Sequence, residues 1–108
     1  MSTVTFIETD TPRHSPWGSI DDAAQEAPGI WWVSTPSHGG YIISQQRRNA
    51  MPEPFRSHRP YAGPLAYEED CDWSCVVLAW PTEFAQRDVD RARACYQQWI
   101  ANKEARAR

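Results

Sequence analysis

The clearest pattern of apolar and polar positions in the chain is a pair of β-rich runs, 29–35 and 41–44. The five residues between them include Pro36 and two glycines, which predicts a hairpin with a glycine-bearing loop. The first run holds four consecutive apolar residues, Ile30 to Val33. We therefore expect this strand to be central in a small sheet, with both faces covered and a helix packed across it.

Weaker patterns precede the hairpin. The Thr-rich run from Val4 to Ile7 favours a short strand. Ser19 is a good N-cap, acidic residues follow it, and a Pro-Gly pair at 28–29 is a stop signal. This arrangement predicts a two-turn helix over 19–26.

The segment after the hairpin combines a short helix with a long loop. Ser44 is expected to cap a helix that runs to Met51 and ends before Pro52. Four prolines and one glycine then rule out regular structure over 52–65. A loop of that length inside a domain is usually functional or mobile, so this segment is a candidate binding region.

Two further helices are expected near the C-terminus. Residues 68–80 begin with acidic side chains and continue with apolar ones at helical spacing. The strongest amphipathic stripe spans 88–103. We expect Trp99 on this stripe to share one core with Trp31 or Val33 of the central strand.

Composition limits the architecture. The chain has 108 residues, of which 41% are hydrophobic and 12% aromatic, which suits one domain over 1–108 with a charged tail from about 104. The expected fold class is α+β, with a small antiparallel sheet of about three strands packed by two main helices.

Charge and cysteine content narrow the function. The net charge of −3 argues against a generally basic nucleic-acid binder. The N-terminus lacks the basic and apolar regions of a signal peptide, and no apolar run approaches membrane-spanning length. The three cysteines lack a disulfide-scaffold pattern and are interpreted as free thiols in a reducing compartment. We expect a cytoplasmic protein without a membrane partner.

Ser37 and His38 place a hydroxyl beside an imidazole on a turn, and Glu69 or Asp72 of the acidic run could assist His38 in a small metal-dependent or acid/base hydrolase. However, adjacent Ser and His residues on an extended loop point apart, and the chain has no nucleophile elbow. Hydrolysis is therefore kept as an alternative, and no residue is assigned a catalytic role.

A zinc site is a second hypothesis. Cys71 and Cys75 stand one helical turn apart and could supply two ligands, with His38 or His58 completing the set. No second close ligand pair accompanies them, and buried free cysteines are common in protein cores. We therefore expect no metal and no cofactor.

Basic and aromatic residues alternate between positions 47 and 61. Such a pattern can follow phosphates and stack bases, or it can bind an acidic protein surface. Nucleic-acid binding through the arginines of 47–59 is therefore a further alternative. The residues are Arg47, Arg48, Phe55, Arg56, His58, Arg59 and Tyr61.

Three sequence blocks occur together: SPWG at 15–18, APGI to VSTPSHGG over 27–40, and YEEDCDW at 67–73. As a set they resemble an uncharacterised family of short domains found in phages and bacterial mobile elements, some of them near anti-restriction genes. The resemblance covers roughly residues 15–100 and implies no reaction. It implies a context in which small proteins often inhibit host defence by binding.

The resulting hypothesis is a non-catalytic binding protein of phage or mobile-element origin. It would inhibit a bacterial defence complex, such as a CRISPR effector or a restriction enzyme, in the host cytosol. We expect the contact on loop 54–61, because prolines lower its entropy cost of binding, and on the acidic run 68–72, which would orient the partner. The predicted contact residues are Phe55, Arg56, Arg59, Tyr61, Glu68, Glu69, Asp72 and His38.

Overall fold

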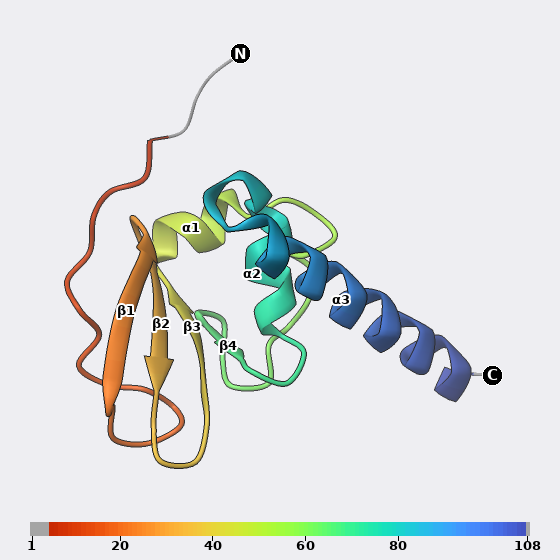
Figure 1. Ribbon diagram of the computed structural model, residues 1–108, viewed down its shortest axis with the longest axis horizontal. Helices are drawn as coiled ribbons and strands as arrows, with labels where there is room; N and C mark the ends of the chain where they lie inside the picture. The colour runs from red at the N-terminus through yellow and green to blue at the C-terminus, as the bar shows by residue number, and fades with distance from the viewer. Residues whose placement is uncertain (1–4, 108) are drawn as a thin grey trace.

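The computed structural model describes residues 5–107, in which four strands form an antiparallel sheet in the order β1-β2-β3-β4 (Figure 1). The strands are β1 (Asp22–Ala27), β2 (Ile30–Ser34), β3 (Gly39–Ile43) and β4 (Ala66–Glu68). The helices are α1 (Gln45–Ala50), α2 (Trp73–Ala79), the 3-10 turn η1 (Pro81–Glu83) and α3 (Gln86–Ala107). The α+β prediction of a small antiparallel sheet packed by helices is confirmed, with one strand more than expected.

The predicted hairpin is formed by β2 and β3, and its alternation divides the side chains between two faces. Trp32 pairs with Tyr41, and Tyr41 pairs with Tyr67 of β4, so these three rings lie on one face. That face carries the main core and is covered by the helices. Trp31 and Val33 point to the opposite face.

The predicted helix over 19–26 is wrong, because Asp22–Ala27 forms strand β1. Two isolated turns of helix are marginal in water, whereas the open edge of β2 offers a full set of hydrogen bonds. Gly29 has φ +79°, so the Pro-Gly signal makes the β1–β2 turn instead of ending a helix. Strand β2 is therefore an interior strand of the sheet, between β1 and β3.

The N-terminal segment covers the second face of the sheet. The indole of Trp31 donates to Thr9 Oγ1 at 3.1 Å, and Gln25 donates to Glu8 at 2.6 Å. The expected strand over 4–7 is not formed by residues 5–7, and Val4 lies outside the described residues. The segment is held mainly through side chains; the backbone N–H of Ile7, for example, donates to Gln46 Oε1 at 2.8 Å.

The glycines of the hairpin belong to β3 and not to the loop. Gly40 pairs with Val33 and Glu68 in the sheet, and a Cβ atom there would lie 2.8 Å from the ring of Trp17. A methyl group would therefore separate Trp17 from the sheet. Gly40 thus allows two close approaches, that of the Tyr67 carbonyl oxygen in β4, which a Cβ atom would meet first, and that of the Trp17 ring.

The helix predicted over 68–80 begins later than expected. Glu68 ends β4, residues 69–72 form a turn, and α2 starts at Trp73. Tyr67 is fully buried and pairs with Tyr41, so sheet pairing and burial outweigh the helical tendency of the acidic residues. The acidic side chains consequently lie on a turn and not in a helical first turn.

The predicted core of Trp99 with Trp31 or Val33 is also wrong. Val89 and Ala92 of α3 do join the main core. Trp99 instead packs against Tyr96 and His58, with ring centroids 5.8 and 4.7 Å away. The C-terminal part of α3 extends past the sheet (Figure 1).

The largest fully buried side chain is that of Arg47 in α1. Its guanidinium donates to both carboxylate oxygens of Glu83 at 2.6 and 2.8 Å and to the Pro28 carbonyl at 2.9 Å. The guanidinium carbon lies 3.6 Å from the ring centroid of Phe6 and 4.8 Å from that of Trp80. Arg47, expected within a basic surface, is a structural residue.

We predict that Glu83→Ala lowers the free energy of unfolding by about 3 kcal/mol, because it leaves the Arg47 charge buried without its partner. Asp90→Ala removes an exposed carboxylate 3.8 Å from Arg93 and is expected to cost less than about 1 kcal/mol. Urea unfolding of both variants measures the difference. Equal losses would contradict a dominant role for the Arg47–Glu83 pair.

A second prediction concerns alkaline stability. Burial raises the pKa of Cys75 to about 12 and that of Tyr67 to about 12, so the folded state holds both protons more tightly than the unfolded state. Stability should be full below about pH 9 and fall as the pH rises toward 12. In Cys75→Ala the fall should be shallower, because only Cys71 and the buried tyrosines then hold their protons more tightly in the folded state. Urea midpoints between pH 8 and 10.5 test this, and parallel curves would refute it.

Candidate functional site

The loop over 52–65 is irregular, as predicted, but it has an ordered turn at its start. The Glu53 carboxylate accepts hydrogen bonds from the backbone N–H and hydroxyl of Ser57, and these bonds lower the pKa of Glu53. The ring of Phe55 packs against Tyr96, with centroids 5.4 Å apart. Phe55 therefore anchors the loop to α3 and is half-buried.

Asp72 holds the second half of this loop. Its Oδ1 lies 2.6 Å from His58 Nε2, and its Oδ2 accepts the backbone N–H of Tyr61 at 3.1 Å. The carboxylate is nearly buried, and the His58 ring also meets the ring of Trp99 edge-on. The loop, the turn before α2 and helix α3 therefore meet at the side chain of His58.

This arrangement fixes the position of Tyr61. Its ring is 92% exposed although its backbone is tied to Asp72. Beside it is a hollow of about 320 Å³ lined also by the acidic side chains of Glu68 and Asp70. The structure thus presents an aromatic ring to solvent next to carboxylates.

The hairpin tip adds His38 to the same acidic corner. His38 Nδ1 lies 3.7 Å from Glu68 Oε1 and 3.5 Å from Glu69 Oε1, and the imidazole is half exposed. The structure brings His38 to Glu69, as the hydrolase alternative requires, but Asp72 is bound to His58. The Ser37 hydroxyl donates to the Trp17 carbonyl at 3.4 Å, away from the carboxylates.

Because Arg47 is buried, three arginines of the predicted basic surface remain: Arg48, Arg56 and Arg59. Arg48 and Arg56 line one hollow of about 450 Å³, and Arg48 and Arg59 line another of about 390 Å³. Within the described residues, Arg48 Nη1 is buried and has no hydrogen-bond partner. Arg56 lies 3.9 Å from Glu53, too far for a strong pair. This basic side of the loop could accept anionic groups.

The three cysteines are free thiols. Burial raises the pKa of Cys71, and the neighbouring Cys95 raises it further. Cys95 donates a weak hydrogen bond to the Asp70 carbonyl at 3.6 Å. In residues 5–107, no group of three or more His, Cys, Asp or Glu side chains is arranged to hold a metal ion.

A further hollow of about 510 Å³ was missed by sequence reasoning. Three aromatic rings, three carboxylates and one arginine line it, from the strands and from the beginnings of α2 and α3. The alternation of apolar residues in β2 and β3 could have predicted the side of this hollow that the sheet forms. Other side chains of its lining come from β1 and α3, which are distant in the sequence. Its residues are Glu26, Trp32, Tyr41, Glu69, Trp73, Asp88 and Arg91.

Comparison with protein families places this geometry in context. Residues 10–106 match the Domain of unknown function (DUF7007). The chain belongs to this family. Comparison with curated proteins and with solved structures found no significant match. The predicted membership of an uncharacterised family is thereby confirmed, and no helix in the described part of this DUF7007 domain is long and apolar enough to cross a bilayer.

We predict that Asp72→Ala destabilises the DUF7007 domain by about 2 kcal/mol, because it breaks two largely buried hydrogen bonds. The Tyr61 amide should then exchange with solvent faster, since it loses its acceptor. Asp70→Ala is the matched control, because Asp70 is exposed on the same turn. Hydrogen exchange measured by NMR distinguishes the two variants, and an unchanged Tyr61 amide in Asp72→Ala would refute the positioning role.

Proposed function

We propose that this DUF7007 domain is a non-catalytic protein-binding domain whose contact is centred on Tyr61. The observation that carries the proposal is the 92% exposed ring of Tyr61 on a loop held by Asp72. Tyrosine is enriched among residues that dominate binding energy at interfaces. A loop that is ordered before binding also loses less conformational entropy when the partner arrives.

The charges around Tyr61 support a protein partner with a mixed surface. Glu68 and Asp70 line the hollow on one side of the ring, with Glu69 and His38 next to them. Arg56 and Arg59 are exposed on the same loop as Tyr61. Adjacent patches of opposite sign select one orientation of approach, more than they add affinity. The partner should offer an apolar slot flanked by both charges.

The class of partner that we propose is a bacterial defence complex, such as a CRISPR effector or a restriction enzyme, met in the host cytosol. Its support is the resemblance of the three sequence blocks to short domains of phages and mobile elements. Under this proposal the domain inhibits by occupying a surface and not by chemistry. No catalytic residue or cofactor is assigned.

Nucleic-acid binding remains a second candidate because one observation favours it. Arg48 Nη1 has no partner in the described part of the chain, and Arg48 lines two hollows, one with Arg56 and the other with Arg59. A phosphate backbone on this side would show affinity that falls steeply with salt. Fluorescence anisotropy with labelled duplex DNA and single-stranded RNA at 50 and 200 mM salt tests this candidate.

We predict that Tyr61→Ala abolishes inhibition of a defence system while leaving the fold intact. In a bacterium with an active CRISPR or restriction system, the unmodified protein should raise the plating efficiency of a targeted phage, and Tyr61→Ala should not. Binding to the purified effector, measured by calorimetry, should weaken by at least about 2 kcal/mol. The matched control is Ile7→Ala, which truncates another large exposed apolar side chain of the described residues, 70% exposed.

The double variant Arg56→Ala/Arg59→Ala locates the rest of the contact. A loss of binding similar to that of Tyr61→Ala would extend the interface along the loop, whereas a loss in His38→Ala alone would move it to the hairpin tip. If Tyr61→Ala and Ile7→Ala bind the effector equally well, the contact is not centred on Tyr61.

A further inference from the structure

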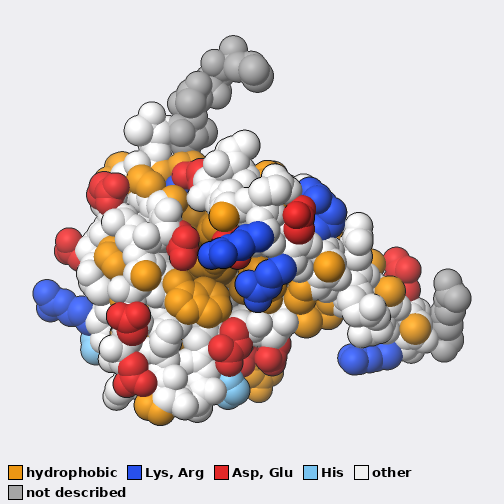
Figure 2. Space-filling view, viewed as in Figure 1, with side chains coloured by type: hydrophobic (Ala, Val, Ile, Leu, Met, Phe, Trp, Pro, Cys, Tyr) orange, Lys and Arg blue, Asp and Glu red, His pale blue; other side chains and the backbone are white. Residues whose placement is uncertain are grey.

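The hollow between the sheet and the beginnings of α2 and α3 has the size of a small-molecule site, at about 510 Å³. Figure 2 shows apolar side chains at its centre, surrounded by acidic and basic ones. The aromatic lining is Trp32, Tyr41 and Trp73. The rings of Trp32 and Tyr41 pack edge to face at 4.8 Å, which holds both in place.

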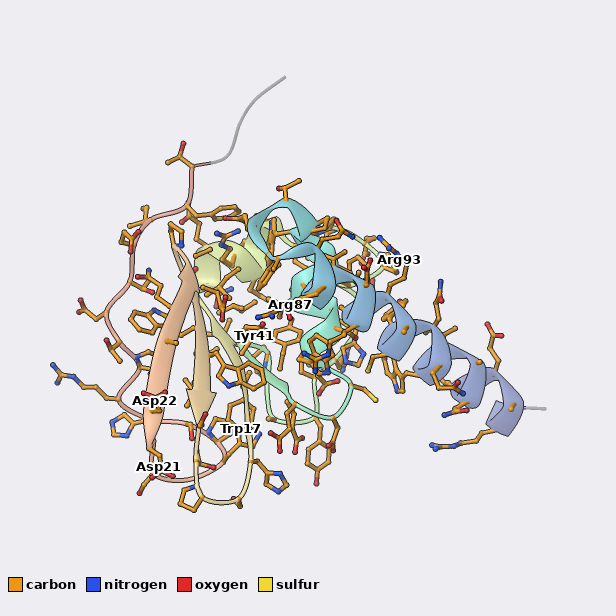
Figure 3. The ribbon with its side chains drawn as sticks, in the orientation of Figure 1. Trp17, Asp21, Asp22, Tyr41, Arg87 and Arg93 are labelled. Carbon is orange, nitrogen blue, oxygen red and sulfur yellow. The ribbon has the colours of Figure 1, made fainter. Side chains whose placement is uncertain are left out.

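Tyr41 supplies a hydrogen-bonding group to this hollow. The residue is only 7% exposed, and it lines the hollow. Figure 3 shows Tyr41 between the sheet and the first part of α3, where Asp88 and Arg91 line the same hollow. A ligand N–H group in the hollow could donate a hydrogen bond to the Tyr41 hydroxyl oxygen.

The charges around the hollow are unbalanced. Three carboxylates, from Glu26, Glu69 and Asp88, face one guanidinium, that of Arg91. Both Glu26 and Asp88 act on the Tyr41 hydroxyl, whose pKa is raised by burial first and by these carboxylates second. The lining therefore favours a positively charged occupant.

Arg91 shows that the walls already accept a cation at the rim. Its guanidinium carbon lies 5.6 Å from the ring centroid of Trp73, and its Nη1 lies 3.7 Å from Asp88 Oδ1. Both contacts are long, and the Arg91 side chain is 73% exposed. Arg91 thus leaves the interior of the hollow to another group.

We propose that this hollow binds an organic cation, a guanidinium or a substituted ammonium group. The faces of Trp32 and Trp73 would attract the charge, as aromatic cages do. Asp88 and Glu26 would pair with it, and the Tyr41 hydroxyl would accept a hydrogen bond from an N–H donor. Glu69 is the one residue that this site has in common with the proposed contact around Tyr61. Either proposal can therefore fail without the other.

The test uses two probes, tetramethylammonium chloride and N-acetyl-arginine methylamide, with sodium chloride at equal ionic strength as the blank. Binding is measured by tryptophan fluorescence and by NMR shifts of the indole N–H groups. Both probes should bind the full chain, with the arginine derivative tighter if a partner's side chain is the natural occupant. Tetramethylammonium should bind at least as well if the occupant is a free small cation.

Three variants should change the affinity for the probes in three different ways. Asp88→Asn should weaken binding about tenfold by removing a carboxylate that pairs with the cation. Arg91→Ala should tighten binding several-fold, because it removes a competing cation from Trp73 and Asp88. Asp90→Asn, two residues along α3 and exposed, should leave the affinity unchanged. Glu26→Gln repeats the test from another element if Asp88→Asn does not fold.

Two outcomes would overturn the proposal. One is that neither probe binds the folded protein at tens of millimolar, a concentration well above the dissociation constant of even a weak specific site. The other is a reversed pattern, in which acetate or inorganic phosphate binds and Arg91→Ala abolishes that binding. The reversed pattern would assign the hollow to an anion.

Discussion

The buried pair of Arg47 and Glu83 is the interaction on which the arrangement of this domain depends. It connects α1, the β1–β2 turn through the Pro28 carbonyl, and η1, which leads directly into α3. Burying a guanidinium is costly unless its donors are satisfied, and here two carboxylate oxygens, a carbonyl and two aromatic rings surround it. Because α3 starts from this point, the pair sets the position of every functional side chain that α3 contributes.

Helix α3 links the two proposed surfaces. Its first turns supply Asp88 and Arg91 to the aromatic hollow, and a later turn supplies Trp99, which packs on His58 behind the Tyr61 loop. The turn over 69–72 connects the same surfaces from the other side, since Glu69 lines the hollow and Asp72 holds the loop. A partner that binds at Tyr61 would therefore lie close to the elements that form the hollow.

The sheet explains how a small domain accommodates many tryptophans. Trp17 and Trp31 lie on the face covered by the N-terminal segment, where Gly40 leaves room for the Trp17 ring. Trp32, Trp73 and Trp80 lie on the helical side, partly buried against the core. Large aromatic rings are thus used on both faces, and those at the edge of the core become available for binding.

Local signals in the sequence determined the elements that need no distant partner. The β2–β3 hairpin, the Ser44-capped helix α1, the proline-held loop and the amphipathic helix α3 follow from turn residues, caps and periodicity. The sequence also made Tyr61 and the acidic run candidates for a partner contact, which stays a proposal. Tertiary structure decided the rest. Residues 22–27 became a strand because β2 needed a partner, Arg47 became buried because Glu83 reached it from 36 positions away, and Asp72 found His58 and Tyr61 across a loop. The aromatic hollow likewise exists only where three strands, two helices and the turn over 69–72 meet. Propensity is a property of neighbours in the chain, whereas burial and pairing between distant residues depend on the packing of the whole sheet.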